Sequence, residues 1–353
     1  MSGSKPEAGD PGGLTYRDAG VDIDAQDEAL RRIKEVLRAT RTPGVLADIG
    51  AFGGMFAPDL GGMRQPVLVA SCDGVGTKLR VAFEAGVHHT VGRDLVNHCV
   101  DDILVQGARP LFFLDYVATG KLDPATLASI VEGIARGCRE NGCALLGGET
   151  AEMPGFYRDG EYDVAGFVVG LVDRDAVLDG SRVAVGDLLV GLPSAGLHTN
   201  GYSLARKILF ERLSLRVDSQ VPELGGTVAD VLLAEHRSYL RLLEAPVARR
   251  MLHALAHITG GGLTDNVPRI LPALTSARID RESWNVPPLF RLLEREGNVG
   301  EAEMYRTFNM GIGMVAVVDP GRVGELESHL DALGERHFRI GEIVPGDGRV
   351  RYA

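Results

Sequence analysis

The sequence predicts a mixed α/β protein, and three observations support this prediction. Short apolar runs of strand length alternate with segments in which apolar residues recur at helical spacing. The chain has 353 residues, more than one hydrophobic core usually holds. Strand, glycine loop, acid and helix follow in similar order on either side of a polar, turn-rich segment over 173–186. We therefore expect two domains, 14–173 and 174–353, after a disordered tail over 1–13 that is rich in glycine, proline and acids.

The first domain is expected to begin with a helix over about 24–40. Leu30, Ile33 and Leu37 recur there at helical spacing. A glycine-rich loop over 50–62 follows, and its sequence AFGGMF is typical of a mobile, functional loop. The other expected elements are, in order, a strand over 66–71, a helix after residue 92, a strongly apolar run over 111–118, an amphipathic helix over about 124–140, and strands over 144–146 and 164–172.

The second domain repeats this alternation. Its expected elements are, in order, a strand over 188–192, a glycine-rich turn into a helix at about residue 202, a helix start within TGGGLTDN over 259–266, a strand over 311–318 and a final helix over 323–333. We expect the last two of these elements to complete the core.

Composition excludes several classes of function. A formal net charge of −11 argues against a nucleic-acid or anionic-membrane partner, because both favour a basic surface. The four cysteines form no CxxC pair and are expected to be reduced core thiols, which excludes a disulfide framework or a cysteine zinc site. The N-terminus resembles no signal peptide, and no apolar run is long enough to cross a bilayer. We therefore expect a cytoplasmic protein.

The segment DGVGTK, from Asp73 to Lys78, is a candidate phosphate site because it follows a predicted strand. Its glycines let the backbone approach a ligand, the Asp73 carboxylate can bind Mg²⁺, and the Lys78 ammonium can meet a phosphate. It is not a Walker A motif. The same residues are equally compatible with a solvated turn.

A second candidate is the helix after residue 92. Asp94, Asn97 and Asp101 would share one face of it, while the apolar residues fall largely on the other side. Asp94 alone could be a helix cap, and Asp101 or Asp102 a solvated acid. Adjacent acids in an apolar stretch repel each other unless a cation or donor neutralises them, which favours a metal site.

Other candidates lie in glycine-rich turns. Glu149 in GGETAEMPG is placed at the end of a predicted strand, where α/β proteins present ligands, although a turn glutamate is the simpler alternative. His198 and Asn200 in GLHTNGYS precede a predicted helix, whose first amides can hold an anion; the alternative is a glycine-tolerant loop with an asparagine cap. Asp265 in TGGGLTDN could bind metal or stabilise a first helical turn.

The remaining histidines give no local metal pattern. His88 and His89 form a pair that we interpret as surface residues, since no third ligand stands at metal spacing nearby. His253 and His257 are four residues apart but lack the HExxH pattern, so we expect no zinc catalysis.

With these segments described, the chain resembles the aminoimidazole ribonucleotide (AIR) synthetase family, the phosphoribosylformylglycinamidine cyclo-ligases. The resemblance runs from about residue 16 to residue 343. The matching stretches, in family order, are YRDAGVDID, DGVGTKL, QGARPLFFLDYVATGKLD, GGETAEMPG, YDVAGF, HTNGYSLARKIL, HITGGG and MYRTFNMGIGM.

The resemblance implies a fold, an activity and cofactors. The fold would be the two-domain AIR synthetase-like fold, in which the N-terminal half forms a homodimer and the active site lies in a cleft between units. The reaction would be ring closure of formylglycinamidine ribonucleotide to AIR in de novo purine biosynthesis, with ATP giving ADP and phosphate. ATP would phosphorylate the formyl oxygen, and an amidine nitrogen would then attack that carbon. Mg²⁺ would neutralise the phosphate charge.

The resemblance also implies roles for residues. Lys34, Asp73, Lys78 and His198 would be catalytic, with Lys34 on a mobile N-terminal segment that closes over the nucleotide. The implied metal ligands are Asp73, Asp94, Asp102, Glu149 and Asp265. The implied nucleotide-binding residues are Gly53, Gly54, Asp73, Gly74, Gly76, Thr77, Lys78, Asp94, Glu149, Asn200, Gly260 and Gly261.

This chain departs from the family's usual pattern in places. Asp101 stands where asparagine is common, which leaves open whether Asp101 or Asp102 is the ligand. Asn97 and His98 replace the common Ala-Met before Cys99, and Asp265 replaces a glutamate. Cys72 stands in place of a threonine. The alternatives are a related ATP enzyme, such as formylglycinamidine ribonucleotide synthetase or a thiamine-phosphate or selenophosphate kinase-like enzyme, and a non-catalytic nucleotide-binding regulator.

Overall fold

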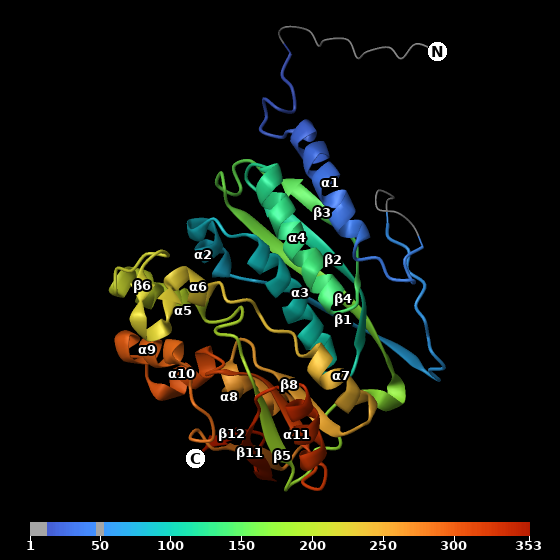
Figure 1. Ribbon diagram of the computed structural model, residues 1–353, viewed down its shortest axis with the longest axis vertical. Helices are drawn as coiled ribbons and strands as arrows, with labels where there is room; N and C mark the ends of the chain where they lie inside the picture. Colours follow the sequence, from blue (N-terminus) through green and yellow to red (C-terminus); the bar gives the residue numbers. More distant parts are fainter. Residues whose placement is uncertain (1–12, 47–52) are drawn as a thin grey trace.

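Two β-sheets, one in each half of the chain, organise the fold (Figure 1). The structure is a computed structural model that describes residues 13–46 and 53–353. The predicted tail over 1–13, apart from Gly13, and the first part of the AFGGMF loop therefore lie outside the described residues. No helix in the described ranges is long and apolar enough to cross a membrane.

The first half contains a four-stranded sheet with the strand order β1-β4-β2-β3. β4 pairs antiparallel with β1 and β2, while β2 and β3 are parallel. The elements of this half are α1 (Ile23–Arg38), β1 (Pro66–Gly74), α2 (Lys78–Ala85), α3 (His89–Leu104), β2 (Arg109–Thr119), α4 (Pro124–Glu140), β3 (Ala144–Glu152) and β4 (Tyr162–Asp173).

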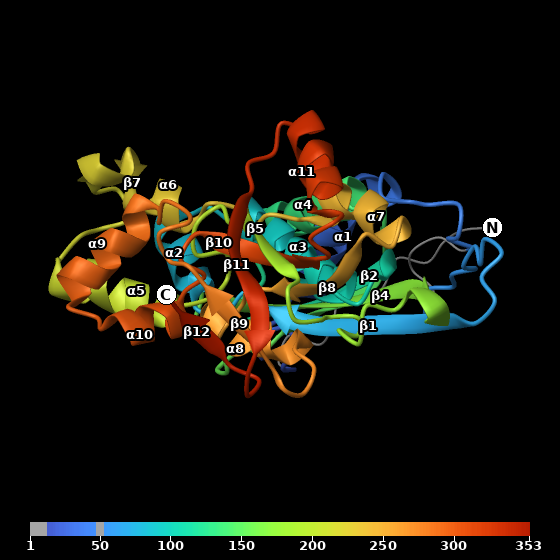
Figure 2. The ribbon, with the colours of Figure 1, turned by 90° about the horizontal axis from the view of Figure 1, so that it is seen from below.

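Helices cover one face of this sheet, and Figure 2 shows α3 and α4 on the same side of β1, β2 and β4. α4 begins where the Asp123 side chain accepts a hydrogen bond from the Thr126 amide at 2.8 Å, with proline at its first position. Its apolar face is buried, as its spacing predicts. α1 packs on α4, with Ile33 and Leu37 buried.

The other face of the first sheet carries no helix from the described residues. Side chains alternate along a strand, so the outward positions of β1 and β4 include Leu68 and Phe167. Leu68 is 66% exposed and Phe167 is 42% exposed. The result is an apolar sheet face open to solvent in the single chain.

The second half contains a six-stranded sheet with the order β12-β9-β11-β5-β10-β8. Its elements are η1 (Arg174–Ala176), β5 (Leu188–Pro193), α5 (Tyr202–Arg206), the π-helical turn η2 (Lys207–Arg212), β6 (Gln220–Val221), η3 (Pro222–Leu224), β7 (Gly226–Thr227), α6 (Val228–Leu232), α7 (Leu240–Ala248), β8 (Leu252–His257), α8 (Gly262–Asn266), η4 (Val267–Ile270), β9 (Thr275–Ile279), α9 (Pro288–Gly297), α10 (Glu301–Thr307), β10 (Ile312–Val318), α11 (Val323–Ala332), β11 (Phe338–Pro345) and β12 (Val350–Tyr352).

The structure corrects several sequence expectations. α2 follows DGVGTK directly and was not predicted, and α3 begins at His89, so Asp94 is not in its first turn. β3 continues through the glycines to Glu152, so Glu149 lies inside a strand rather than at its end. β11 and β12 follow the helix that was expected to complete the core.

Candidate functional site

The DGVGTK and GLHTNGYS segments meet at a cavity of about 450 Å³ between the two halves. Asp73, Gly74 and Gly76 line it from the first half, and Thr199 and Asn200 line it from the second. Beside it, the Thr77 hydroxyl lies 3.1 Å from the Ser203 hydroxyl. Two segments that are far apart in sequence and were separately predicted to bind a ligand therefore share one cavity.

Asp73 and Asp163 are the acids that line this cavity, and the Asp73 side chain is 42% exposed. Its Oδ2 lies 2.6 Å from Nε2 of His98, and its Oδ1 accepts a hydrogen bond from the Gly74 amide at 2.7 Å. Partial burial opposes its ionisation, but the hydrogen bond and charge of His98 outweigh this and lower the pKa of Asp73. The carboxylate is therefore ionised at neutral pH.

Lys78 and Asp94 form a buried ion pair. Nζ of Lys78 lies 2.6 Å from Oδ2 of Asp94, and both side chains are fully inaccessible. The ammonium also donates to the carbonyl oxygens of Ala234 and His198 at 2.8 and 3.2 Å. Burial raises the pKa of Asp94, although the Lys78 charge opposes this shift. Because the ammonium already has three oxygen partners, a contact between Lys78 and phosphate stays a prediction.

Asp94, Asn97 and Asp101 do share one face of α3, as their spacing predicts. This face binds main-chain groups of the second half. The His236 amide donates to Asp94 at 2.6 Å, the Asn97 amide donates to the His236 carbonyl at 2.6 Å, and the Tyr239 amide donates to Asp101 at 2.9 Å. These contacts neutralise part of the acidic face without a metal.

Asp101 and Asp102 differ sharply in their surroundings. Asp101 is fully buried, and burial raises its pKa well above the ordinary value. The Asp102 side chain is 28% exposed, and its oxygens lie 2.9 Å from Nδ1 of His257 and 3.0 Å from the Ser71 hydroxyl. Burial opposes ionisation of Asp102 too, but His257 and His98 lower its pKa overall. Asp102 and His257 line a neighbouring cavity of about 380 Å³.

Four histidines, His98, His198, His236 and His257, form a cluster between the two halves. Nε2 of His236 lies 3.1 Å from Nε2 of His257. The rings of His198 and His236 are stacked, with centroids 4.0 Å apart. Burial lowers the pKa of His198 and His236 well below the ordinary value. For His98, burial also opposes the charge, but the hydrogen bond and charge of Asp73 raise its pKa overall.

Sequence reasoning identified only His198 of this cluster as a site residue. The others lie on separate elements, so no local spacing connects them. His253 and His257, which were not expected to form a zinc site, lie on one strand, and His253 contacts Asp187 at 2.7 Å outside the cluster. The available signal was the pair of unusual residues at positions 98 and 101, both of which point into this region.

The predicted metal ligands do not meet at one point in the single chain. Asp73, Gly166, Asp115 and Gly148 stand in one row across the sheet. Glu149 is therefore about three strand spacings from Asp73, roughly 14 Å, and it faces the opposite, open side of the sheet. Asp265 pairs with Arg306 at 3.0 Å. Metal binding by Glu149 and Asp265 stays a prediction.

The other predicted residues are distributed around the site. Lys34 is exposed on α1. Gly54 packs so closely on Leu146 that a Cβ atom there would lie 2.4 Å from it, and Gly53 has open space around it. A Cβ atom on Gly260 would lie 3.2 Å from the Asn200 side chain, so this glycine keeps the cavity residue Asn200 close; Gly261 next to it has a φ of 100°.

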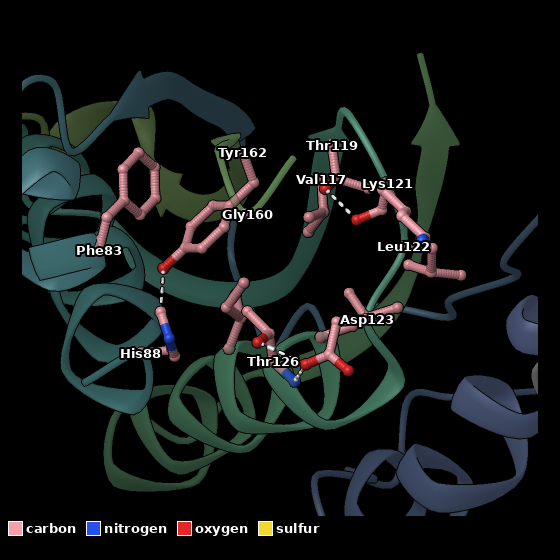
Figure 3. A pocket seen from close by; sticks show the side chains of 12 residues that line it. Phe83, His88, Val117, Thr119, Lys121, Leu122, Asp123, Thr126, Gly160 and Tyr162 are labelled. Atoms are coloured by element: carbon pink, nitrogen blue, oxygen red, sulfur yellow. Dashed lines mark hydrogen bonds between the residues drawn. The ribbon is translucent and has the colours of Figure 1, made fainter. Parts of the chain in front are cut away.

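A separate cavity of about 250 Å³ lies between α4 and the loops after β2 and before β4 (Figure 3). None of the predicted site residues lines it. His88, which we interpreted as a surface residue, is half-buried here and lies 2.9 Å from the Tyr162 hydroxyl. The ring is only partly exposed because it packs edge-on against the Tyr162 ring, with centroids 5.7 Å apart, whereas His89 is exposed as expected.

Two family models match the chain. The N-terminal domain of AIR synthase-related proteins matches residues 61–172, and the C-terminal domain matches residues 184–353. Curated relatives include phosphoribosylformylglycinamidine cyclo-ligases from Citrifermentans bemidjiense, 54% identical over 95% of this chain and 96% of the relative, and from Trichlorobacter lovleyi, 53% identical over 96% of both chains.

Solved structures show the same fold at lower sequence identity. The thiamine-monophosphate kinase of Stenotrophomonas maltophilia aligns with a TM-score of 0.66 at 18% identity, over 92% of this chain and 95% of that one. Hydrogenase maturation protein HypE in complex with ATP aligns with a TM-score of 0.65 at 21% identity, over 91% and 90%. These structures show the fold. The family models over both halves, and the curated relatives that are 53–54% identical over nearly the whole chain, show that the chain belongs to the AIR synthase-related family, among the phosphoribosylformylglycinamidine cyclo-ligases.

Proposed function

We propose that this chain closes the ring of formylglycinamidine ribonucleotide to form AIR, ADP and phosphate. The observation that carries the proposal is identity of 54% with a cyclo-ligase, over 95% of this chain and 96% of the relative. The structure supports it with one cavity that joins DGVGTK and GLHTNGYS. The fold alone would fit other ATP enzymes of the family equally well. The choice of the cyclo-ligase reaction therefore rests on the sequence identity over nearly the full length.

The reaction requires the protein mainly to position the reacting groups and to neutralise charge. The formyl oxygen attacks the terminal phosphorus of ATP and ADP leaves; the amidine nitrogen then attacks the formyl carbon, and the oxygen departs with the phosphate. No covalent bond to the enzyme is needed. Gly76 lines the cavity with open space at its Cβ position, so phosphate oxygens can approach its main chain, and the Asn200 side chain can orient a polar substrate group.

The cavity also suits Mg²⁺ carried by the nucleotide. The carboxylates of Asp73 and Asp102 are the hard oxygen donors that Mg²⁺ prefers, and both are partly exposed. Mg²⁺ bound there would neutralise phosphate charge. The residues of this chain would hold the ion, keep the carboxylates ionised and exclude water from the reacting carbon.

A direct assay tests the proposal. Purified protein with formylglycinamidine ribonucleotide, ATP and Mg²⁺ should form about one ADP for each AIR, without ammonia. Asp73→Ala should lower turnover at least about 100-fold, by analogy with loss of a transition-state contact. Asp218→Ala, at an exposed acid remote from the cavity, is the matched control. ADP formed without AIR would favour a different ATP enzyme, and neither product would favour a nucleotide-binding regulator.

We also propose a homodimer that uses the open face of the first sheet. Leu68 and Phe167 are exposed there in the single chain, and a second copy would bury them. Glu149 faces the same side, so it could serve a nucleotide site only across such an interface. This would explain why the predicted ligands are split between the two faces of the sheet.

Domain limits and location complete the proposal. We place the domain boundary between residues 173 and 174, since β4 ends at Asp173 and the next strand begins at Leu188. A cytoplasmic location is supported by four free cysteines, three of which are buried. The acidic net charge of −11 supports a function without nucleic acid.

A further inference from the structure

Two histidines and two aspartates stand together where the 450 Å³ and 380 Å³ cavities adjoin. Nε2 of His98 lies 2.6 Å from Asp73 and 3.9 Å from Asp102, and Nδ1 of His257 lies 2.9 Å from Asp102. Ligand atoms of His98, Asp102 and His257 all lie within 4.8 Å of one another. α3 contributes two of the residues, β1 one and β8 one.

The donors of His98, Asp102 and His257 fit an ion with three protein ligands and a fourth position for water. Ligands at about 2.1 Å from a metal in tetrahedral geometry lie about 3.4 Å from each other. The separations of 2.9 Å between His257 and Asp102 and of 3.9 Å between His98 and Asp102 bracket this value. The His98 and His257 rings are inclined by 68°, so their in-plane nitrogen lone pairs can converge on one point.

The other nitrogen of each ring has a different neighbour. The Thr199 hydroxyl lies 2.7 Å from Nδ1 of His98, and Nε2 of His236 lies 3.1 Å from Nε2 of His257. Nε2 of His98 and Nδ1 of His257 are therefore the nitrogens that face carboxylates, and a cation can take the place of the proton shared there.

We propose that His98, Asp102 and His257 form a binding site for a divalent transition-metal ion. Imidazole nitrogen suits Zn²⁺, Co²⁺ and Fe²⁺ far better than Mg²⁺, which requires oxygen ligands. The inference goes beyond the proposed function, which assigns no role to His98 or His257. On binding, the ion replaces the protons shared between each ring and its carboxylate, and these protons pass to solvent.

The test measures metal binding without nucleotide or substrate. Chelator-treated protein is titrated with Co²⁺ and followed by visible absorption, and with Zn²⁺ followed by calorimetry, both in excess Mg²⁺. We expect one ion per chain and an absorption spectrum of a four-coordinate Co²⁺ site. His98→Met restores the residue common in the family and should weaken binding by more than about 10-fold, the least that loss of a supporting contact costs.

Two further variants make the result decisive. His253→Gln removes a histidine outside the cluster and should bind Co²⁺ as the unmodified protein does. Thr199→Ala leaves all three donors but removes the hydroxyl that contacts the His98 ring, and should weaken binding about 10-fold. Equal binding by His98→Met, or no stoichiometric binding by the unmodified protein, overturns the inference. A protein that binds Co²⁺ but forms no AIR would refute the proposed reaction instead.

Discussion

Asp73 and Asp94 are both acids of the predicted nucleotide region, yet their surroundings give them different tasks. Asp73 opens to the cavity with 42% of its side chain exposed. Asp94 is sealed against Lys78 and a main-chain amide of the second half. We therefore expect Asp94 to contribute mainly to stability rather than to ligand binding. Removing a buried acid leaves its buried counter-charge, here Lys78, unpaired.

Asp94→Ala should therefore destabilise the protein. We expect the free energy of unfolding in urea to fall by about 3–5 kcal/mol, the usual cost of breaking a buried ion pair. Asp73→Ala is the matched control and should change stability by less than about 1 kcal/mol while abolishing turnover. Equal stability of the two variants would contradict the structural assignment of Asp94.

Asp115 on β2 should make stability depend on pH. Burial raises its pKa to about 7. The folded protein therefore holds a proton between about pH 4 and pH 7 that the unfolded chain has released, and stability decreases as pH rises through this window. Asp115→Asn removes this decrease of stability with rising pH. Urea unfolding should show the variant gaining stability relative to the unmodified protein from pH 5 to pH 8, and a constant difference would refute the shift.

At the residue scale, the sequence predicted which side chains belong to the site more accurately than it predicted which residues those side chains contact. DGVGTK and GLHTNGYS were identified because glycine turns beside an acid or a histidine are local patterns. His98, His236 and His257 come from separate elements, and only the fold brings them within contact distance. Glu149 was misplaced because a strand can continue through two glycines when its neighbour, here β2, pairs with it along that stretch.

Helices α3 and α4 owe their close approach to two glycines. A Cβ atom on Gly133 would lie 1.9 Å from the His89 carbonyl oxygen, and one on Gly92 would lie 2.1 Å from the Ile130 carbonyl oxygen. Main-chain atoms cannot shift away as a flexible side chain can. The glycines therefore fix the position of α3, and with it the positions of Asp94, His98 and Asp102.

Gly133→Ala should separate these helices. Overpacking of this kind costs about 1–3 kcal/mol of unfolding free energy, and thermal denaturation measures it. Gly324→Ala is the control, because Gly324 lies exposed on α11 with no atom near its Cβ position, and should stabilise by up to about 1 kcal/mol. A Gly133→Ala variant as stable as Gly324→Ala would show that the contact can relax.

Elements with a complete local signal were predicted most accurately. α4 has an aspartate cap, an early proline and a clear apolar face, and its bounds were predicted to the residue. α2 was missed because its sequence begins inside the glycine motif, which masks the helix start. β11 and β12 follow a helix near the C-terminus and depend on pairing with β9 and β5, which are distant in sequence.

At the scale of the whole molecule, the open face of the first sheet is the main unpaired surface. The hydrophobic effect favours covering such a face, and the neighbouring helices all lie on the opposite side. A second copy is the partner that every solution of the protein contains.

Phe167→Lys should weaken self-association. Sedimentation should show a dimer for the unmodified protein and a shift toward monomer for this variant, because a charge would be buried at the centre of the interface. Leu333→Lys, at a residue 52% exposed beyond α11, should leave the dimer intact. A Phe167→Lys protein that sediments as the unmodified one does would place the interface elsewhere.

The contacts between α3 and the chain around His236 restrict how the enzyme can open. Lys78, Asp94, Asn97 and Asp101 all bond to main-chain groups of the second half, and all are buried. A hinge motion that separated the two halves would break several of these buried hydrogen bonds at once. The two halves therefore act as one rigid block, and a nucleotide must enter by displacement of surface segments rather than by a clamshell motion.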